Sequence, residues 1–303
     1  MKKPVTKVPA NRPRPRSDRQ AHDDMATPRP PLDTTTPFGR RRPGIAATAA
    51  WRLATAGLLS PSARRLVRKR LAGRFSGPFD VQVAGLKLRA YPTENRDDRV
   101  LLGRATMPEP AELALIAPRF GPGMVFVDIG ANVGTYALFV AKAAGPSGRV
   151  LAFEPHPRTF AKLAFNVAAN DNGAIVARNL AIAETAGTMT LHSDGGGNIG
   201  HASLLAEAAG TVRAGHEVAV RPLAAEIADQ GLTRIDLLKI DVEGFEDRAL
   251  LPFFDQAEPS LWPAAILIET VLSRLWRTDC LAVLAHRGYV VAGETAENVL
   301  LAR

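Results

Sequence analysis

From residue 124 onward, short and almost continuously apolar runs alternate with segments whose apolar residues recur every three or four positions. The short runs predict strands at 124–129, 149–153, 174–182, 235–241 and 264–269, followed by 288–292 and 297–302. The longer segments predict helices at 134–144, 157–170, 246–254 and 278–287. Apolar strands separated by helices are typical of a parallel sheet covered on both faces. We therefore predict a Rossmann-like, doubly wound α/β fold with a mostly parallel, seven-stranded sheet.

Further elements are predicted outside this alternation. Residues 79–91 alternate apolar and polar side chains around Ala84-Gly85, which indicates an N-terminal β-hairpin. A helix is expected at 109–118, and short strands at 187–192 and 217–220.

The first 74 residues have a different composition. Residues 1–43 are rich in Pro and Arg with almost no apolar side chains, so we predict a disordered basic tail. Residues 44–74 are predicted to be a basic helical connector, in which Ser60 suits the N-cap and Pro61 the first helical position. We expect 75–303 to form the single catalytic domain.

Charge is distributed unevenly between these parts. Residues 1–74 hold 18 Lys/Arg against 4 Asp/Glu, whereas 75–303 hold 20 against 26, so a net +14 and a net −6 make up the formal +8. An acidic body argues against a nucleic-acid partner. The basic extension could instead make peripheral contact with an anionic membrane surface, although a solvated connector is the favoured interpretation.

The cysteine content bears on the compartment. The chain has one cysteine, Cys280, which excludes an internal disulfide framework. We expect a cytoplasmic protein, either free or at the inner face of the membrane.

The clearest motif is VFVDIGANVGT at 125–135, an apolar strand that ends at Asp128 and turns at Gly130 into a helix. A dinucleotide site would favour G-x-G-x-x-G, but here the spacing from Gly130 to Gly134 is G-x-x-x-G, with Asn132 at the middle position. The carboxylate of Asp128 suits a ligand with hydroxyls and an amine better than one with two phosphates. S-adenosylmethionine is such a ligand, while an NAD(P)-dependent oxidoreductase stays open as an alternative.

Other strand ends carry further candidates. Glu154 follows the second strand, where a carboxylate can accept hydrogen bonds from both ribose hydroxyls. Ala181 lies at the carboxyl end of the third strand, on the side expected for the adenine. Asp241 ends the fourth strand and Glu243 follows it, and ligands of open α/β sheets bind beyond such carboxyl ends.

A hydroxyl acceptor would need a base. Asp241 is the first candidate and His201, which follows a glycine-rich stretch that could form a substrate lid, is the second. Asp241, Glu243 and Glu269 could together hold Mg²⁺, but we favour a metal-free site.

Three motifs in this order resemble the FkbM family of S-adenosylmethionine-dependent methyltransferases. They are VDIGANVG at 127–134, FEP at 153–155 and LKIDVEG at 238–244, and NRDD at 95–98 is also similar. The resemblance covers roughly 79–300. It implies the class I methyltransferase fold and O-methylation of a hydroxyl on a sugar, polyketide or similar small molecule or glycan.

The motifs and the resemblance together give two sets of candidate residues. The cofactor-binding set is Asp128, Gly130, Ala131, Asn132, Gly134, Glu154, Ala181 and Asp241, and the catalytic set is Asp241, Glu243 and His201. An RNA methyltransferase that uses the basic tail is an alternative, but only 6% of the residues are aromatic and no basic stripe is interleaved with aromatic side chains.

Overall fold

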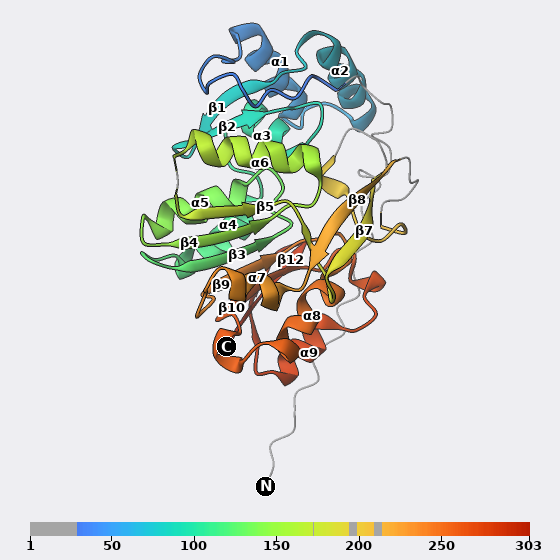
Figure 1. Ribbon diagram of the computed structural model, residues 1–303. Coiled ribbons are helices and arrows are strands. Elements are labelled where there is room, and N and C mark those ends of the chain that lie inside the picture. The colour runs from blue at the N-terminus through green and yellow to red at the C-terminus, as the bar shows by residue number, and fades with distance from the viewer. Residues whose placement is uncertain (1–28, 172, 194–198, 209–213) are drawn as a thin grey trace.

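The computed structural model describes residues 29–303, except 172, 194–198 and 209–213 (Figure 1). A seven-stranded sheet has the order β11-β12-β10-β9-β3-β4-β5. Its strands are β3 (Val125–Ile129), β4 (Arg149–Phe153), β5 (Ile175–Arg178), β9 (Leu237–Ile240), β10 (Ala265–Glu269), β11 (Val290–Glu294) and β12 (Asn298–Ala302).

The sheet is mostly parallel, as predicted. Strands β5, β4, β3, β9 and β10 run parallel, and β12 is inserted antiparallel between β10 and β11. In the central register Asp128 of β3 lies beside Lys239 of β9. The sequence order reverses at β3, so the loops after β3, β4 and β9 meet at one edge, where ligands of such sheets bind.

Helices cover both faces of the sheet, as the apolar strands require (Figure 1). Helices α4 (Pro110–Ile116), α5 (Thr135–Ala144) and α6 (Pro157–Ala169) lie on one face, with buried side chains such as Leu138 and Leu163. Helices α7 (Leu223–Asp229), α8 (Glu246–Gln256) and α9 (Cys280–His286) cover the other, around Phe253 and Leu284. Short 3-10 helices occur at 117–119, 199–201, 259–261 and 273–275.

The strand predicted at 174–182 is divided between two sheets. After β5 the chain leaves the main sheet, and β6 (Ala181–Ile182) pairs with β8 (Ala214–Arg221), which also pairs with β7 (Gly187–Ser193). Asn179 marks the break, because its side-chain amide donates to the carbonyls of Glu154 and Pro155. This three-stranded sheet was not predicted, although the short strands that form it were.

The N-terminal segment differs from the expectation of a disordered tail reaching residue 43. Residues 1–28 lie outside the described part, but 29–43 pack along the hairpin of β1 (Phe79–Val83) and β2 (Leu86–Ala90). Buried Asp80 accepts from the backbone amides of Gly39 and Arg41, and buried Arg89 donates to the carbonyl of Asp33. Because the Asp80–Arg89 ion pair (2.7 Å) is buried, these backbone groups complete hydrogen bonds that water would otherwise supply.

The predicted connector is likewise part of the body. Helix α1 (Ile45–Thr55) packs against α3 (Arg96–Arg104), where the α-carbon of Gly103 lies so close to Thr55 that a side chain would overlap it. Trp51 is 1% exposed, and its indole N–H donates to the carbonyl of Phe75 at 3.0 Å. Helix α2 (Pro61–Arg74) follows, and Ser60 caps it by accepting from the amide of Ala63, as predicted.

Replacement of Trp51 by Ala is therefore expected to destabilise the folded protein by about 3–5 kcal/mol, the usual cost of removing a buried aromatic side chain. Leu53→Ala is the matched control on the same helix, because Leu53 is 53% exposed and its loss should change stability by less than about 0.5 kcal/mol. Urea denaturation of both variants measures the difference. Equal stabilities would mean that α1 is only loosely docked.

Candidate functional site

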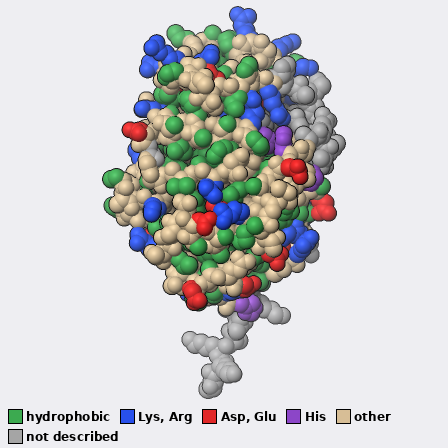
Figure 2. Space-filling model, in the orientation of Figure 1, with side chains coloured by type: hydrophobic (Ala, Val, Ile, Leu, Met, Phe, Trp, Pro, Cys, Tyr) green, Lys and Arg blue, Asp and Glu red, His purple; other side chains and the backbone are tan. Residues whose placement is uncertain are grey.

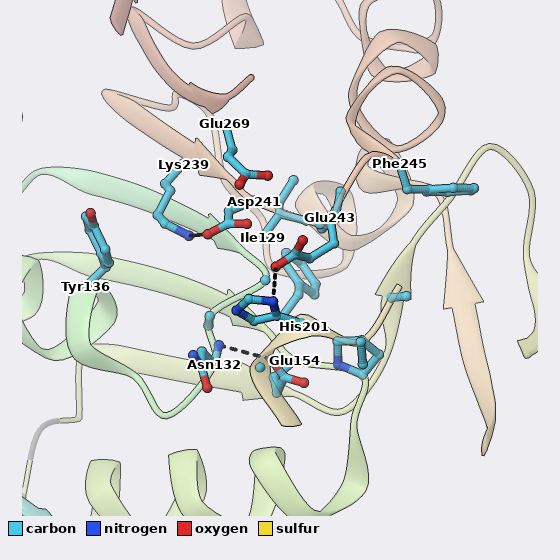
Figure 3. Close-up of a pocket in the computed structure, with 18 of the residues that line it drawn as sticks. Ile129, Asn132, Tyr136, Glu154, His201, Lys239, Asp241, Glu243, Phe245 and Glu269 are labelled. Atoms are coloured by element: carbon cyan, nitrogen blue, oxygen red, sulfur yellow. Dashed lines mark hydrogen bonds and ion pairs between the residues drawn. The ribbon is translucent and has the colours of Figure 1, made fainter. Parts of the chain in front are cut away.

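A cavity lies at the carboxyl ends of β3, β4, β9 and β10 (Figure 3). It contains about 1290 Å³ of empty space, part of which is open to solvent. Eight of the ten residues in the cofactor-binding and catalytic sets line it: Gly130, Ala131, Asn132, Glu154, Ala181, His201, Asp241 and Glu243. Strand topology therefore brings together residues that are up to 113 positions apart, from Gly130 to Glu243.

Two predicted cofactor residues, Asp128 and Gly134, do not line this cavity. Asp128 is fully buried beneath it and lies 3.8 Å from the ammonium of Lys239. Gly134 begins α5 with a φ of +90°, and a Cβ there would lie 2.6 Å from Leu163. Both residues therefore lie beneath the cavity, not in its wall.

Gly130 is required by the close approach of two loops. Its φ is +82°, and an added Cβ would overlap the backbone carbonyl oxygen of Asp241. The amide of Asp241 donates to the carbonyl of Ile129 at 3.0 Å, which holds the ends of β3 and β9 together. The glycine thus fixes where Asp241 enters the cavity.

Glu154 is held by backbone amides. One carboxylate oxygen accepts from Asn132 N at 3.0 Å and the other from His156 N at 2.8 Å. Burial raises the pKa of Glu154 to about 7, against these two stabilising hydrogen bonds. Each oxygen keeps a further lone pair, so the oriented carboxylate can still accept hydrogen bonds from a ligand.

Lys239 is the buried cation of the site. Its ammonium lies 3.5 Å from Asp241 (Figure 3). It also lies 3.8 Å from Asp128 and 5.0 Å from the ring centroid of Tyr136. Burial alone would lower the pKa of Lys239, but the surrounding carboxylates, led by Asp241 and Asp128, hold it above its ordinary value. Lys239 therefore stays charged and balances two acids at the strand ends.

The side chains of His201 and Glu243 approach each other at the cavity, where Nδ1 of His201 lies 3.9 Å from Oε1 of Glu243 (Figure 3). Glu243 has a φ of +55°, and its carbonyl accepts from the hydroxyl of Ser203 at 2.9 Å. Glu246, not Glu243, accepts from the loop amides of Val242 and Gly244. Glu243 lines the cavity. Most of the proposed glycine-rich lid before His201 lies outside the described residues.

A second group of cavity residues was not among the candidate site residues chosen from the sequence. The hydroxyl of Tyr136 donates to Glu109 at 2.8 Å, and the amide of Asn95 donates to Asn132 at 2.6 Å. Burial, reinforced by the charge of Glu109, raises the pKa of Asp97 to about 7. Asn95 and Asp97 fall within the NRDD motif, but only the packing of α3 over the strand ends shows that they reach the cavity.

The described residues contain no group of three or more His, Cys, Asp or Glu side chains arranged to hold a metal ion. Asp241, Glu243 and Glu269 all line the cavity, yet they do not form such a group. The positive charge beside Asp241 comes from the ammonium of Lys239, 3.5 Å away.

The strand order, with one antiparallel strand between two others at the edge, defines the class I methyltransferase fold. A family model described as the methyltransferase FkbM domain matches residues 128–277. The chain is 31% identical to the 31-O-demethyl-FK506 methyltransferase FkbM of Streptomyces tacrolimicus, over 57% of this chain and 75% of that protein. It is 29% identical to the methyltransferase sdnD of Sordaria araneosa, over 56% and 75% respectively.

This chain belongs to the FkbM family of methyltransferases. Among solved structures, it is similar to the precorrin-6y C5,15-methyltransferase of Geobacter metallireducens GS-15, with a TM-score of 0.38 and 13% identity over 64% of this chain and 86% of that one. The family assignment favours methyl transfer over the oxidoreductase alternative.

Removal of the buried cation should destabilise the fold. Lys239→Met leaves Asp128 and Asp241 without their neutralising partner, which is expected to cost about 3–5 kcal/mol of unfolding free energy. The pKa of Asp128 is already raised to about 6 by burial, so lowering the pH below 6 should protonate it and shrink the deficit. Urea denaturation above and below this pH measures the effect.

Lys87→Met, which removes an exposed lysine from β2, is the control and should be nearly neutral at either pH. A deficit for Lys239→Met that does not change with pH would contradict the charge-balance explanation.

Proposed function

We propose that this protein is an S-adenosylmethionine-dependent O-methyltransferase that acts on a hydroxyl of a small molecule or glycan, such as a sugar, a polyketide or a lipid-linked saccharide. The observation that carries the proposal is one cavity in which an oriented Glu154 carboxylate shares the space with Asp241 and the His201–Glu243 pair. Glu154 suits the cofactor, whereas Asp241 and the His201–Glu243 pair suit an acceptor.

The residues at the β3 and β4 ends fit the cofactor. Glu154 offers free lone pairs to a ribose diol, Asn132 lies beside it, and Ala181 follows in the wall of the same cavity. When bound, S-adenosylmethionine supplies a methyl group on a sulfonium, which is electrophilic without assistance from the protein. The chain then has to position an acceptor and manage its proton.

The residues at the β9 end fit that second task. Asp241 is about one-third exposed to the cavity, and its pairing with Lys239 fixes the carboxylate in place. A hydroxyl held against it could give its proton to a carboxylate oxygen, and such general-base assistance contributes roughly 10²–10⁴-fold to rates. His201 is the second candidate, because the neighbouring Glu243 carboxylate would favour the imidazolium that proton acceptance creates.

The acceptor class is inferred from the family. The Streptomyces relative is named for its action on 31-O-demethyl-FK506, which supports a hydroxyl on a small molecule as the acceptor here. Mass spectrometry of metabolites and cell-envelope glycans with and without the gene would identify the acceptor by a mass difference of one CH₂.

Glu154→Ala is expected to weaken S-adenosylmethionine binding by about 1.5–3 kcal/mol, because hydrogen bonds to a charged acceptor are lost. In the unmodified protein, affinity should also fall as the pH drops below about 7, since protonation removes the acceptor charge, and Glu154→Ala should weaken this dependence. Calorimetry across pH measures both effects. Glu184→Ala, at an exposed position, is the control. Unchanged affinity, or binding of NAD(P)H in place of S-adenosylmethionine, would refute the assignment.

Asp241→Asn is expected to lower turnover by about 10²–10⁴-fold with a much smaller change in S-adenosylmethionine affinity. Single-turnover methylation of the identified acceptor, alongside calorimetry, separates the two quantities. His201→Gln is the comparison variant. If His201→Gln abolishes turnover while Asp241→Asn does not, the base is His201; if Asp241→Asn mainly loses affinity, Asp241 is a binding residue.

A further inference from the structure

In the segment formed by α1, α2 and the residues just before them, every charged side chain is basic. Residues 40–74 contain ten Lys or Arg residues and no Asp or Glu. Arg52, Arg65, Lys69 and Arg70 are exposed on the two helices. None of these four side chains lines the catalytic cavity, so the methyltransferase site does not account for their charge.

The same segment exposes most of the large apolar side chains found on the described surface. Ile45 is 92% exposed, Leu53 53%, Leu58 82% and Leu66 50%. The other exposed large hydrophobic residues of the described part are valines on β5 and β11. Figure 2 shows hydrophobic and basic side chains intermixed at the end of the molecule that α1 and α2 form in Figure 1.

Nearby acidic groups do not neutralise this end of the molecule. Asp80 is buried against Arg89, and the side chain of Glu94 is fully buried against Arg158 and Lys162. Asp33 is mostly buried and pairs with Arg41. The surface therefore presents positive charge together with apolar side chains.

We propose that this α1–α2 surface, defined by Ile45, Arg52, Leu53, Leu58, Arg65, Leu66, Lys69 and Arg70, docks the enzyme on an anionic phospholipid bilayer. Basic side chains are attracted to anionic headgroups, while exposed leucines gain by entering the headgroup–acyl boundary. In the described residues no helix is long and apolar enough to cross a bilayer.

A lipid surface fits better than a nucleic acid. Binding to single-stranded nucleic acid uses aromatic side chains for base stacking, whereas Trp51 of α1 is buried against Phe75. Exposed leucine and isoleucine side chains add nothing to phosphate binding, but they contribute to insertion between lipids. Because Trp51 also anchors α1 to the body, docking would hold the catalytic domain in a fixed relation to the membrane.

The test is co-sedimentation of the full chain with vesicles. Phosphatidylcholine vesicles are compared with vesicles of phosphatidylcholine and phosphatidylglycerol, at low and high salt. We expect binding to the anionic vesicles alone, weakened by salt. Binding to neither composition, or equal binding to both, would overturn the proposal.

Two variants assign the binding to this surface. Arg65→Gln/Lys69→Gln/Arg70→Gln should reduce the partition coefficient about 100-fold, since each basic residue contributes roughly fivefold. Leu58→Ser/Leu66→Ser should reduce it at least about tenfold without changing net charge. The matched control, Arg119→Gln/Arg149→Gln/Arg274→Gln, removes three exposed charges from other elements and should bind nearly as tightly as the unmodified protein.

Full binding by the first variant would overturn the proposal and assign binding to other residues, including 1–28. Tight binding of duplex RNA that the leucine variant does not weaken, without vesicle binding, would replace lipid by nucleic acid. Hydrogen exchange of residues 45–70 in the unmodified protein is a second measurement that needs no variant: vesicles should protect this segment, and unchanged exchange would count against docking.

Discussion

The buried ammonium of Lys239 is the interaction on which the site depends. It comes from the central strand β9 and lies within 3.8 Å of carboxylates at the ends of β3 and β9. Two acids so close to each other would repel, and the desolvation of the fully buried Asp128 would be costly without a cation nearby. With Lys239 present, the acids can lie at the switch point of the sheet, and one of them, Asp241, can face the cavity. Asp128 lies below the cavity, a position that its place in the motif did not reveal.

A second chain of buried polar contacts links the N-terminal segment to the same cavity. Arg158 donates to the carbonyl of Pro30 and pairs with Glu94, which also pairs with Lys162 at 2.7 Å. Directly after Glu94, Asn95 donates to Asn132, whose amide orients Glu154. Residues 29–43 therefore support the part of the cavity around Glu154, although they precede the domain predicted at 75–303. Helix α1 anchors the surface proposed to meet lipid.

The sequence predicted well wherever local pattern and covalent spacing were sufficient. The strand predicted at 124–129 is observed at 125–129 and the one predicted at 149–153 is observed there, because a continuous apolar run between turns leaves few alternatives. Gly130 and Glu154 were correctly located at strand ends that line one cavity. Features that depend on a distant partner were not predicted. The strand break at Asn179 depends on hydrogen bonds to the carbonyls of Glu154 and Pro155, and no periodicity in the sequence signals that contact.

The sequence alone determined the class of fold, the order of most of its strands and helices, the family and eight of the residues that line the cavity, because these follow from hydrophobic periodicity and short motifs. Only the tertiary structure decided that Asp128 and Gly134 lie below the cavity, that Tyr136, Glu109 and Asp97 reach it, and that residues 29–74 described as tail and connector pack on the body. The physical reason is the same in each case. A buried charge or a close backbone approach requires a specific partner, and that partner is brought near by the fold, not by its position along the chain.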